Sequence, residues 1–169
     1  MNKNIRLLFI VLFLILLQVL VLNNVLFLGY INPYIYIAFV FIYPLKENRF
    51  PFLILSFLVG LSVDFFSNSG GTHAFSLLFI AYIRLFFIRV LFQKTPVDFH
   101  LFKLHQETFG KVFNYVVILT VIHHLILFSL ANFSIYNLTN VLINTLFSSI
   151  FTLILYFLGT YILVGNKNE

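Results

Sequence analysis

The sequence predicts an all-α polytopic membrane protein in which residues 1–169 form a single integral membrane domain. Hydrophobic residues make up 62% of the chain and charged residues 9%, whereas soluble domains carry roughly 25% charged residues. Ten basic and five acidic side chains cannot cover a soluble globule that must also bury 24 phenylalanines. Mean hydropathy is +1.06. The composition therefore excludes a soluble enzyme.

Two helices are expected in the first uncharged run, which extends from Leu7 to Leu45. A membrane-spanning helix needs about 20 apolar residues, so this run is too long for one crossing. The pair Asn32-Pro33 and other polar or turn residues interrupt its middle, which predicts helices at about 6–27 and 33–45. No small-x-small cleavage pattern follows the first helix, so we expect it to be retained rather than removed as a signal peptide.

Four further helices are expected in the later uncharged runs, which makes six transmembrane helices in all. A turn rich in glycine, serine and asparagine separates two of them, at about 50–66 and 73–92. Polar residues interrupt the uncharged run from Val112 to Asn166, which suits two more helices, at about 111–130 and 137–164. The loops on the outer side are then only a few residues long.

The longest loop, 94–110, is predicted to be a cytoplasmic interfacial segment. Its residues Thr95-Pro96-Val97-Asp98 combine an N-cap threonine, a proline at the first helical position and an acid at the third, as a capped helix requires. Gly110 is typical of a helix end. Apolar side chains such as Phe99 and Phe102 are expected to lie against the membrane surface.

The basic residues predict the orientation, because lysine and arginine are enriched in cytoplasmic loops. With six crossings, nine of the ten basic residues lie on one side, and the tenth is Arg84 within a helix. Both termini are therefore expected in the cytoplasm. The basic residues are scattered singly between apolar runs, which indicates membrane lipid and not nucleic acid as the partner of this charge.

Polar residues inside the membrane are the candidate functional positions, because each is costly without a partner. Ser56, Gly60 and Asp64 are spaced four residues apart, and such a small-residue face lets another helix approach closely. Asp64 is expected near the outer end of its helix, with His73 almost level across the turn as its first candidate partner. Counted from the centre of the turn, Arg84 lies about nine residues deeper along the hairpin than Asp64, too far to pair with it. Arg84 is therefore expected to meet polar groups of another helix.

The last predicted helix carries a polar stripe at successive i+4 positions: Asn140, Asn144, Ser148 and Thr152. This stripe is expected to face protein and not lipid, with His123 and His124 of the preceding helix as candidate partners. Internal packing is the favoured interpretation, because hydrogen bonds between membrane helices mainly determine which faces meet. A groove for a small polar molecule or for a partner helix is the alternative.

The residues do not form a catalytic pattern, so the chain is predicted to be non-enzymatic, with no metal and no cofactor. An intramembrane aspartyl protease needs two carboxylates that share a proton, and Asp64 is the only acid expected at membrane depth. His123 and His124 project about 100° apart on a helix, whereas a metal site needs three convergent ligands.

The segment from Gly60 to Ala74, followed by Ala81-Tyr82-Ile83-Arg84, resembles the signature of the rod shape-determining protein MreD family. The pattern is a glycine, an apolar stretch, an aspartate, a turn with glycine (here Gly70-Gly71), His-Ala, and a tyrosine one helix later. The opening of the chain, from Gln18 to Tyr34, also looks like the start of that family. The positions that match the motif are Gly60, Asp64, Gly71, His73 and Tyr82.

The resemblance implies a non-enzymatic scaffold of the bacterial inner (cytoplasmic) membrane that regulates cell shape. Its expected partner is the single-pass protein MreC, which links it to the MreB filament, the RodA glycosyltransferase and the elongation-specific penicillin-binding transpeptidase. The fold is expected to be similar to the S-components of energy-coupling factor transporters, and the aspartate to hold the helix-turn-helix together. The alternative function is a vitamin-type solute-binding subunit, which an outward cavity lined by Asp64, Arg84 and the polar stripe would favour.

Overall fold

The structure is a computed structural model that describes residues 3–25, 31–45, 48–94, 102–132 and 137–165. Every regular element within these ranges is helical, which confirms the predicted all-α class. Five helices are long and apolar enough to cross a membrane. The chain is therefore a multi-pass membrane protein in its architecture, because such helices satisfy their backbone hydrogen bonds internally, as lipid requires.

The long helices lie within three residues of the predicted bounds at both ends. The first begins as α1 (Lys3–Leu16) and continues through a π-helical turn, η1 (Leu17–Val21), and a 3-10 turn, η2 (Leu22–Asn24). The other four are α3 (Phe50–Ser67), α4 (Thr72–Phe92), α5 (Phe109–Asn132) and α6 (Leu138–Gly165).

The predicted helix over 33–45 is much shorter in the structure. It consists of a 3-10 turn, η3 (Ile35–Ile37), and a single α-helical segment, α2 (Ala38–Ile42). Prolines limit it at both ends: Pro33 precedes it, and Tyr43, which stands before Pro44, has the extended ψ of 127° that a residue before proline prefers. These eight helical residues rise about 13 Å, so they cannot cross as a helix alone, and the count of six stays a prediction.

Part of the predicted interfacial segment 94–110 lies outside the described residues, which omit 95–101 and with them the Thr95–Asp98 cap. In the described part, a 3-10 turn, η5 (Leu104–Gln106), precedes α5. The side chain of Lys94 forms an ion pair of 3.0 Å with Glu107. Helix α5 begins at Phe109, so Gly110 lies in its first turn. The prediction that Gly110 ends a helix is therefore wrong.

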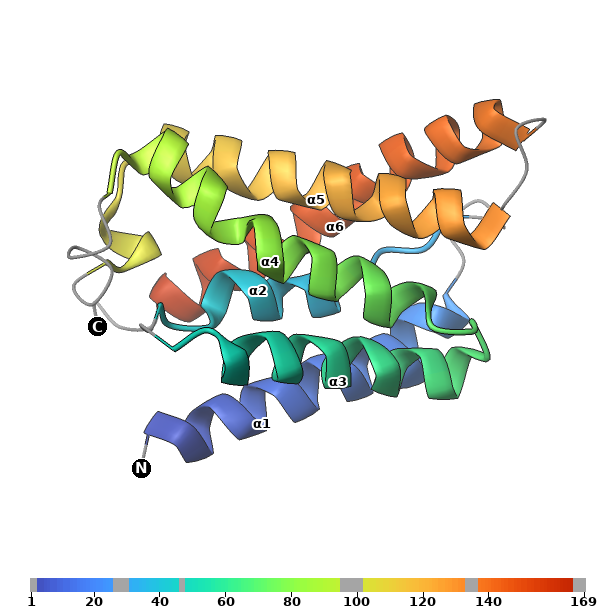
Figure 1. The fold of residues 1–169 in the computed structure, drawn as a ribbon, viewed down its shortest axis with the longest axis horizontal. Coiled ribbons are helices and arrows are strands. Elements are labelled where there is room, and N and C mark those ends of the chain that lie inside the picture. Colours follow the sequence, from blue (N-terminus) through green and yellow to red (C-terminus); the bar gives the residue numbers. More distant parts are fainter. Residues whose placement is uncertain (1–2, 26–30, 46–47, 95–101, 133–136, 166–169) are drawn as a thin grey trace.

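The long helices pack in the order α1, α3, α4, α5, α6, and the short η3–α2 segment lies among them, in contact with α1, α4 and α6. Figure 1 shows α1 and α3 running in the same direction, and Asn23 Nδ2 donates to Ser67 Oγ at 2.7 Å where both end. The chain must therefore return from that end to the start of α3 at Phe50. The η3–α2 segment makes this return through the middle of the molecule.

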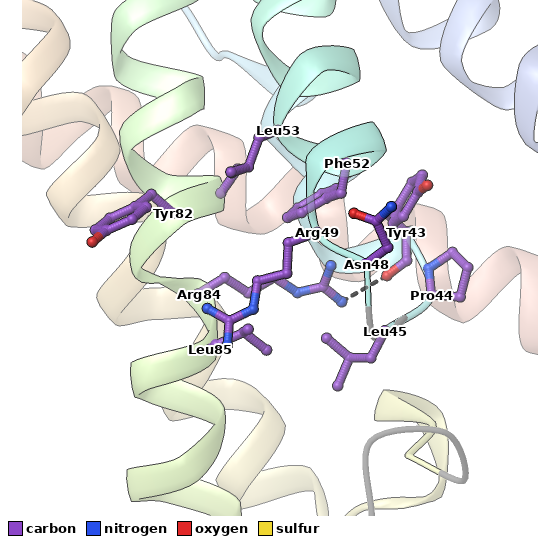
Figure 2. A pocket seen from close by; sticks show the side chains of 11 residues that line it. Tyr43, Pro44, Leu45, Asn48, Arg49, Phe52, Leu53, Tyr82, Arg84 and Leu85 are labelled. Carbon is purple, nitrogen blue, oxygen red and sulfur yellow. Dashed lines mark hydrogen bonds between the residues drawn. The ribbon is translucent and has the colours of Figure 1, made fainter. Parts of the chain in front are cut away.

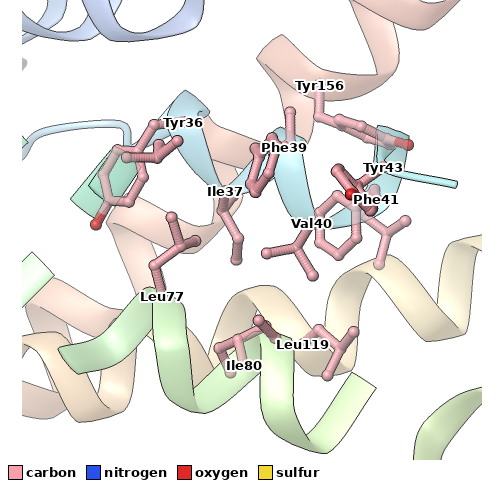
Figure 3. Close-up of a cluster of buried hydrophobic side chains, with 14 of the residues drawn as sticks. Tyr36, Ile37, Phe39, Val40, Phe41, Tyr43, Leu77, Ile80, Leu119 and Tyr156 are labelled. Atoms are coloured by element: carbon pink, nitrogen blue, oxygen red, sulfur yellow. The ribbon is translucent and has the colours of Figure 1, made fainter. Parts of the chain in front are cut away.

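The centre of the hydrophobic core is this return segment (Figure 3). All seven residues from Ile35 to Phe41 are at most 7% exposed. They pack against Leu77 and Ile80 of α4, Leu119 of α5 and Tyr156 of α6. Irregular backbone is tolerated at membrane depth only where protein surrounds it, and the long helices provide that cover.

Candidate functional site

Asp64, near the end of α3, caps the start of α4. Its Oδ1 accepts from the backbone N–H of His73 at 3.0 Å, and its Oδ2 from that of Ala74 at 2.7 Å. These are the second and third residues of α4, whose N-cap is Gly71. A carboxylate there satisfies two amides that have no partner within the helix and interacts favourably with the helix dipole.

The partner of Asp64 is therefore His73, as expected from the spacing, but through the backbone amide of His73 and not through its ring. Ser69 completes the cap, because its Oγ donates to Asp64 Oδ1 at 2.5 Å. The turn between the helices needs left-handed backbone: φ is 51° at Asn68, 66° at Gly70 and 93° at Gly71. Glycine adopts these angles without strain, which explains the Gly70-Gly71 pair.

Gly60 lies at a close approach of α3 to α4. A Cβ atom at this position would be 2.5 Å from Ala74 Cα and 2.6 Å from the carbonyl oxygen of His73. Ser56 and Asp64, four residues to either side, are buried as well. The small-residue face predicted from the sequence thus packs α3 onto α4, and Gly60 permits the approach that brings Asp64 to the α4 amides.

The ring of His73 belongs to a second group of polar residues, which surrounds Tyr36 of η3. The Tyr36 hydroxyl is 2.8 Å from His73 Nδ1 and 3.0 Å from His123 Nε2. One hydroxyl can donate to one ring and accept from the other, so Tyr36 joins α4 to α5. All three side chains are buried.

Polar side chains also bond the irregular backbone that leads into η3. Gln18, which is fully buried, donates through Nε2 to the carbonyl of Pro33 at 3.1 Å and accepts through Oε1 from the N–H of Ile35 at 2.9 Å. The N–H of Tyr34 donates to Thr152 Oγ1 of α6 at 2.9 Å. Three backbone groups that form no helical hydrogen bond are thereby satisfied from two distant helices, as a buried backbone requires.

The histidine next to His123 supports the same arrangement. His124 Nδ1 donates to the carbonyl of Thr120 at 2.8 Å, and its Nε2 lies 3.2 Å from Thr152 Oγ1. The carbonyl can only accept, so a neutral His124 presents the Nε2 lone pair to Thr152. The Ser148 carbonyl, 2.8 Å from Thr152 Oγ1, is a second acceptor for the one proton of this hydroxyl. His124 and the Ser148 carbonyl therefore both contact the hydroxyl that accepts from Tyr34.

The predicted stripe on the last helix is correct for Ser148 and Thr152, which face protein, and wrong for Asn140. Ser148 and Thr152 are buried, at 0% and 1% exposure, whereas Asn144 is half-buried and Asn140 is exposed. The buried face of α6 is rotated from the predicted stripe, and its members are Val141, Thr145, Ser148, Ser149, Thr152 and Tyr156. Asn140 is the third residue of α6 and lies within its first turn, where its side chain is exposed.

Arg84 is separate from the polar groups around Asp64. Its Nη2 donates to the carbonyl of Tyr43, just after α2, at 2.6 Å, and its guanidinium lies 5.0 Å from the centre of the Phe52 ring. Arg84 therefore meets another segment of the chain, as expected, although the acceptor is a backbone carbonyl. Tyr82, which the motif includes, is 69% exposed and makes no part of the cap of Asp64.

Sequence reasoning missed two residues that connect the interior, Gln18 and Tyr36. A signal existed for Gln18, because it is the only polar side chain between Leu7 and Leu22, and a buried amide in an apolar helix needs partners. Tyr36 had no such signal, since tyrosines are spread along the whole chain. Within the described ranges, no three His, Asp or Glu side chains converge on a point where they could hold a metal ion.

No family model, no curated protein and no solved structure matches the chain. The expected likeness to the S-components of energy-coupling factor transporters therefore stays a prediction. The cavity that Arg84 lines does not include Asp64 or the α6 stripe. The combination that would favour a solute-binding subunit is thus not present in that cavity.

Proposed function

We propose that the chain is a membrane scaffold of the MreD type, which acts through lateral contacts with partner helices in the bacterial inner membrane. The observation that carries the proposal is that Asp64 and Gly60 of the motif make their contacts within the fold and not with the surroundings. Asp64, Ser69 and the amides of α4 bond to one another, and Gly60 is covered by Ala74. Because these residues hold the fold together, a partner protein would be recognised by other residues, on the outer surface.

The outer surface is suited to contacts within the membrane. Large apolar side chains on the outside of α3 are exposed, among them Ile54 at 56%, Phe65 at 81% and Phe66 at 63%. Without a hydrophobic driving force between helices in lipid, partner helices are recognised by close packing and shape. A surface of this kind supports a scaffold more than a catalyst.

The proposal includes six crossings with both ends of the chain in the cytoplasm. Helix α1 starts, and α6 ends, at the same end of the bundle (Figure 1), and the η3–α2 segment supplies the sixth passage. Lys94, Lys103 and Lys111 precede or flank α5 at this end, which favours the cytoplasmic side for it. By this assignment, the Asp64 turn is on the outer side.

A pull-down of the tagged protein from its native membrane tests the proposal, with bound proteins and small molecules identified together by mass spectrometry. We expect MreC, with the RodA glycosyltransferase and its transpeptidase in lower yield. Photo-crosslinking residues placed at Ile54 and Phe65 should capture MreC, whereas the buried position Leu77 is a control that should capture none. Recovery of an ATPase-coupling module or a retained vitamin, without MreC, would contradict the scaffold.

The motif residues should affect MreC binding indirectly, by maintaining the shape of the α3–α4 surface. We expect Asp64→Ala to reduce MreC co-purification more than membrane insertion, because the α3–α4 surface loses its shape while the apolar helices still insert. Normal co-purification at normal protein levels would count against the proposal.

A further inference from the structure

A small cavity lies beside Arg84, at the end of the bundle where α3 begins. Its volume is about 70 Å³, and Figure 2 shows it between α3, α4 and the stretch that follows α2. A single water needs only about 10–15 Å³ of such space. The cavity therefore has room for a group with several polar atoms.

Two arginines line the cavity, one buried and one at its rim. Arg84 is 4% exposed, and its Nε and Nη1 atoms have no hydrogen-bond partner within the described residues. Among the described residues, Arg84 donates to the carbonyl of Tyr43, contacts the Phe52 ring and lies beside the Tyr115 hydroxyl, and its Nε and Nη1 remain without an acceptor. Arg49 is exposed at the start of α3 and adds a second guanidinium.

The charge of this site is not neutralised by its described lining. The other lining residues are neutral: Tyr43, Pro44, Leu45, Asn48, Phe52, Leu53, Ala81, Tyr82 and Leu85. A buried guanidinium is costly unless an anion pairs with it and accepts from its N–H groups. Arginine is also the side chain whose planar fork matches the oxygens of a phosphate.

We propose that this cavity binds the phosphate of an anionic phospholipid from the cytoplasmic leaflet, with Arg84 as the inner and Arg49 as the outer ligand. The shared chemistry is a phosphate oxyanion. Two observations favour the lipid as its source over free phosphate. Apolar and aromatic side chains form most of the walls and suit acyl chains. The exposed ring of Tyr82 is at the side of the cavity, and aromatic residues commonly meet headgroups at the membrane surface.

The lipid site does not depend on MreC binding, although its place in the cytoplasmic leaflet rests on the orientation proposed above. It rests only on the cavity, on the unused donors of Arg84 and on the orientation of the bundle. A protein that failed to bind MreC would retain the same site. Lipid binding is measured without any partner protein, so its failure and that of the scaffold are distinguishable.

Native mass spectrometry of the full-length protein, taken from nanodiscs that contain equal amounts of phosphatidylglycerol and phosphatidylcholine, tests the proposal. We expect the wild-type protein to retain phosphatidylglycerol preferentially. Arg84→Gln and Arg49→Gln should each lower the retained amount about tenfold, as the loss of a charge-assisted pair predicts. Because Arg49 is exposed, its variant keeps the test valid even if Arg84→Gln fails to fold.

Arg89→Gln is the matched control, because it removes one exposed arginine from the same helix without touching the cavity lining. Its phosphatidylglycerol retention should equal that of the wild type. Equal retention by all variants, or equal retention of both lipids, would overturn the proposal. Glu47 lies outside the described residues, and Glu47→Gln should leave retention unchanged or raise it; a loss of retention in this variant would also overturn the proposal.

A second arm separates the two sources of phosphate. Inorganic phosphate is added to lipid-depleted protein in detergent, and the melting temperature is recorded for the wild type and Arg84→Gln. We expect phosphatidylglycerol to raise the melting temperature of the wild type in an Arg84-dependent way and inorganic phosphate to have little effect. An equal, Arg84-dependent rise with inorganic phosphate and no retained lipid would overturn the lipid source.

Discussion

The α3–α4 turn and the buried return segment are both irregular stretches of backbone between long helices, yet they are held in different ways. In the turn, the Asp64 carboxylate accepts from Ser69 Oγ and from the amides of His73 and Ala74, all no more than ten residues away. In the return segment, the amide of Tyr34 is satisfied by Thr152, 118 residues later. One region is stabilised by its own sequence and the other by the assembled bundle.

The difference shows what an irregular segment needs at different depths. The turn lies at an end of the bundle, where glycine, a cap and water meet its needs. The return segment lies inside the bundle, where every backbone group must find a partner within the protein. Side chains of η1 and α6 therefore act as substitutes for helical hydrogen bonds.

The largest expected effect disrupts the turn region at Gly60. Gly60→Ala places a Cβ 2.5 Å from backbone of α4 that cannot move aside, so we expect a loss of about 3 kcal/mol or more. Thermal unfolding in detergent, followed by far-UV circular dichroism, measures it, because the chain has no tryptophan. The control is Gly159→Ala in α6, where nothing lies within 4 Å of the new Cβ; equal melting temperatures for both variants would refute the close approach.

The next effect removes the cap itself. Asp64→Ala leaves the amides of His73 and Ala74 buried without acceptors, which should cost about 2–3 kcal/mol. Asp64→Asn keeps one acceptor oxygen and loses the charge at the helix start, so its cost should be about half as large. The same melting measurement ranks the two variants, and a larger loss for Asp64→Asn would contradict the cap.

The helices and the turn were predictable because their signals are local. Uncharged runs of sufficient length place the first helix (α1 with η1 and η2) and α3, α4, α5 and α6 within three residues. The spacing of Gly60, Asp64 and the two turn glycines indicates a close helical hairpin. The groups that Asp64 contacts in space lie within the next ten residues of the sequence. The spacing indicated His73 as a partner of Asp64, but it did not indicate that the contact is made by the backbone amide, nor that Ser69 and the amide of Ala74 also bond to Asp64.

The third prediction concerns Gln18, whose side chain bonds the backbone of the return segment. Gln18→Leu preserves the size and burial of the side chain but leaves the Pro33 carbonyl and the Ile35 amide unsatisfied, so we expect a loss of about 2 kcal/mol. Asn24→Ala is the control, because Asn24 is exposed and its amide donates only to carbonyls of its own helix. Comparable melting temperatures for the two variants would show that Gln18 does not hold the segment.

The smallest expected effect is at Thr152, the second residue that bonds the backbone of the return segment from a distant helix. Thr152→Val keeps the shape and removes the hydroxyl that accepts from Tyr34, which should cost about 1 kcal/mol. Thr160→Val in the same helix is the control, because its hydroxyl donates only to the carbonyl of Phe157 at 2.9 Å. A larger loss for Thr160→Val than for Thr152→Val would contradict the role assigned to Thr152.

The return segment was not predictable from the sequence, for a physical reason. Residues 33–45 are apolar enough for a helix, and only the prolines at 33 and 44 indicate that it is short. The groups that stabilise its backbone come from Gln18 and Thr152, and no local pattern links them to Tyr34. The stripe on α6 failed at Asn140 for a related reason: an i+4 pattern gives a face, whereas the tilt of the helix against its neighbours decides which residues of that face are buried.

The central claim is that local contacts hold the turn and distant contacts hold the return segment. Hydrogen exchange of the wild type, Thr152→Val and Asp64→Asn in nanodiscs, resolved at the amides of Tyr34 and Ala74, tests it most directly. The account predicts that Thr152→Val accelerates exchange at Tyr34 and leaves Ala74 protected, and that Asp64→Asn does the reverse. Acceleration at both amides in both variants, or at neither, would contradict it.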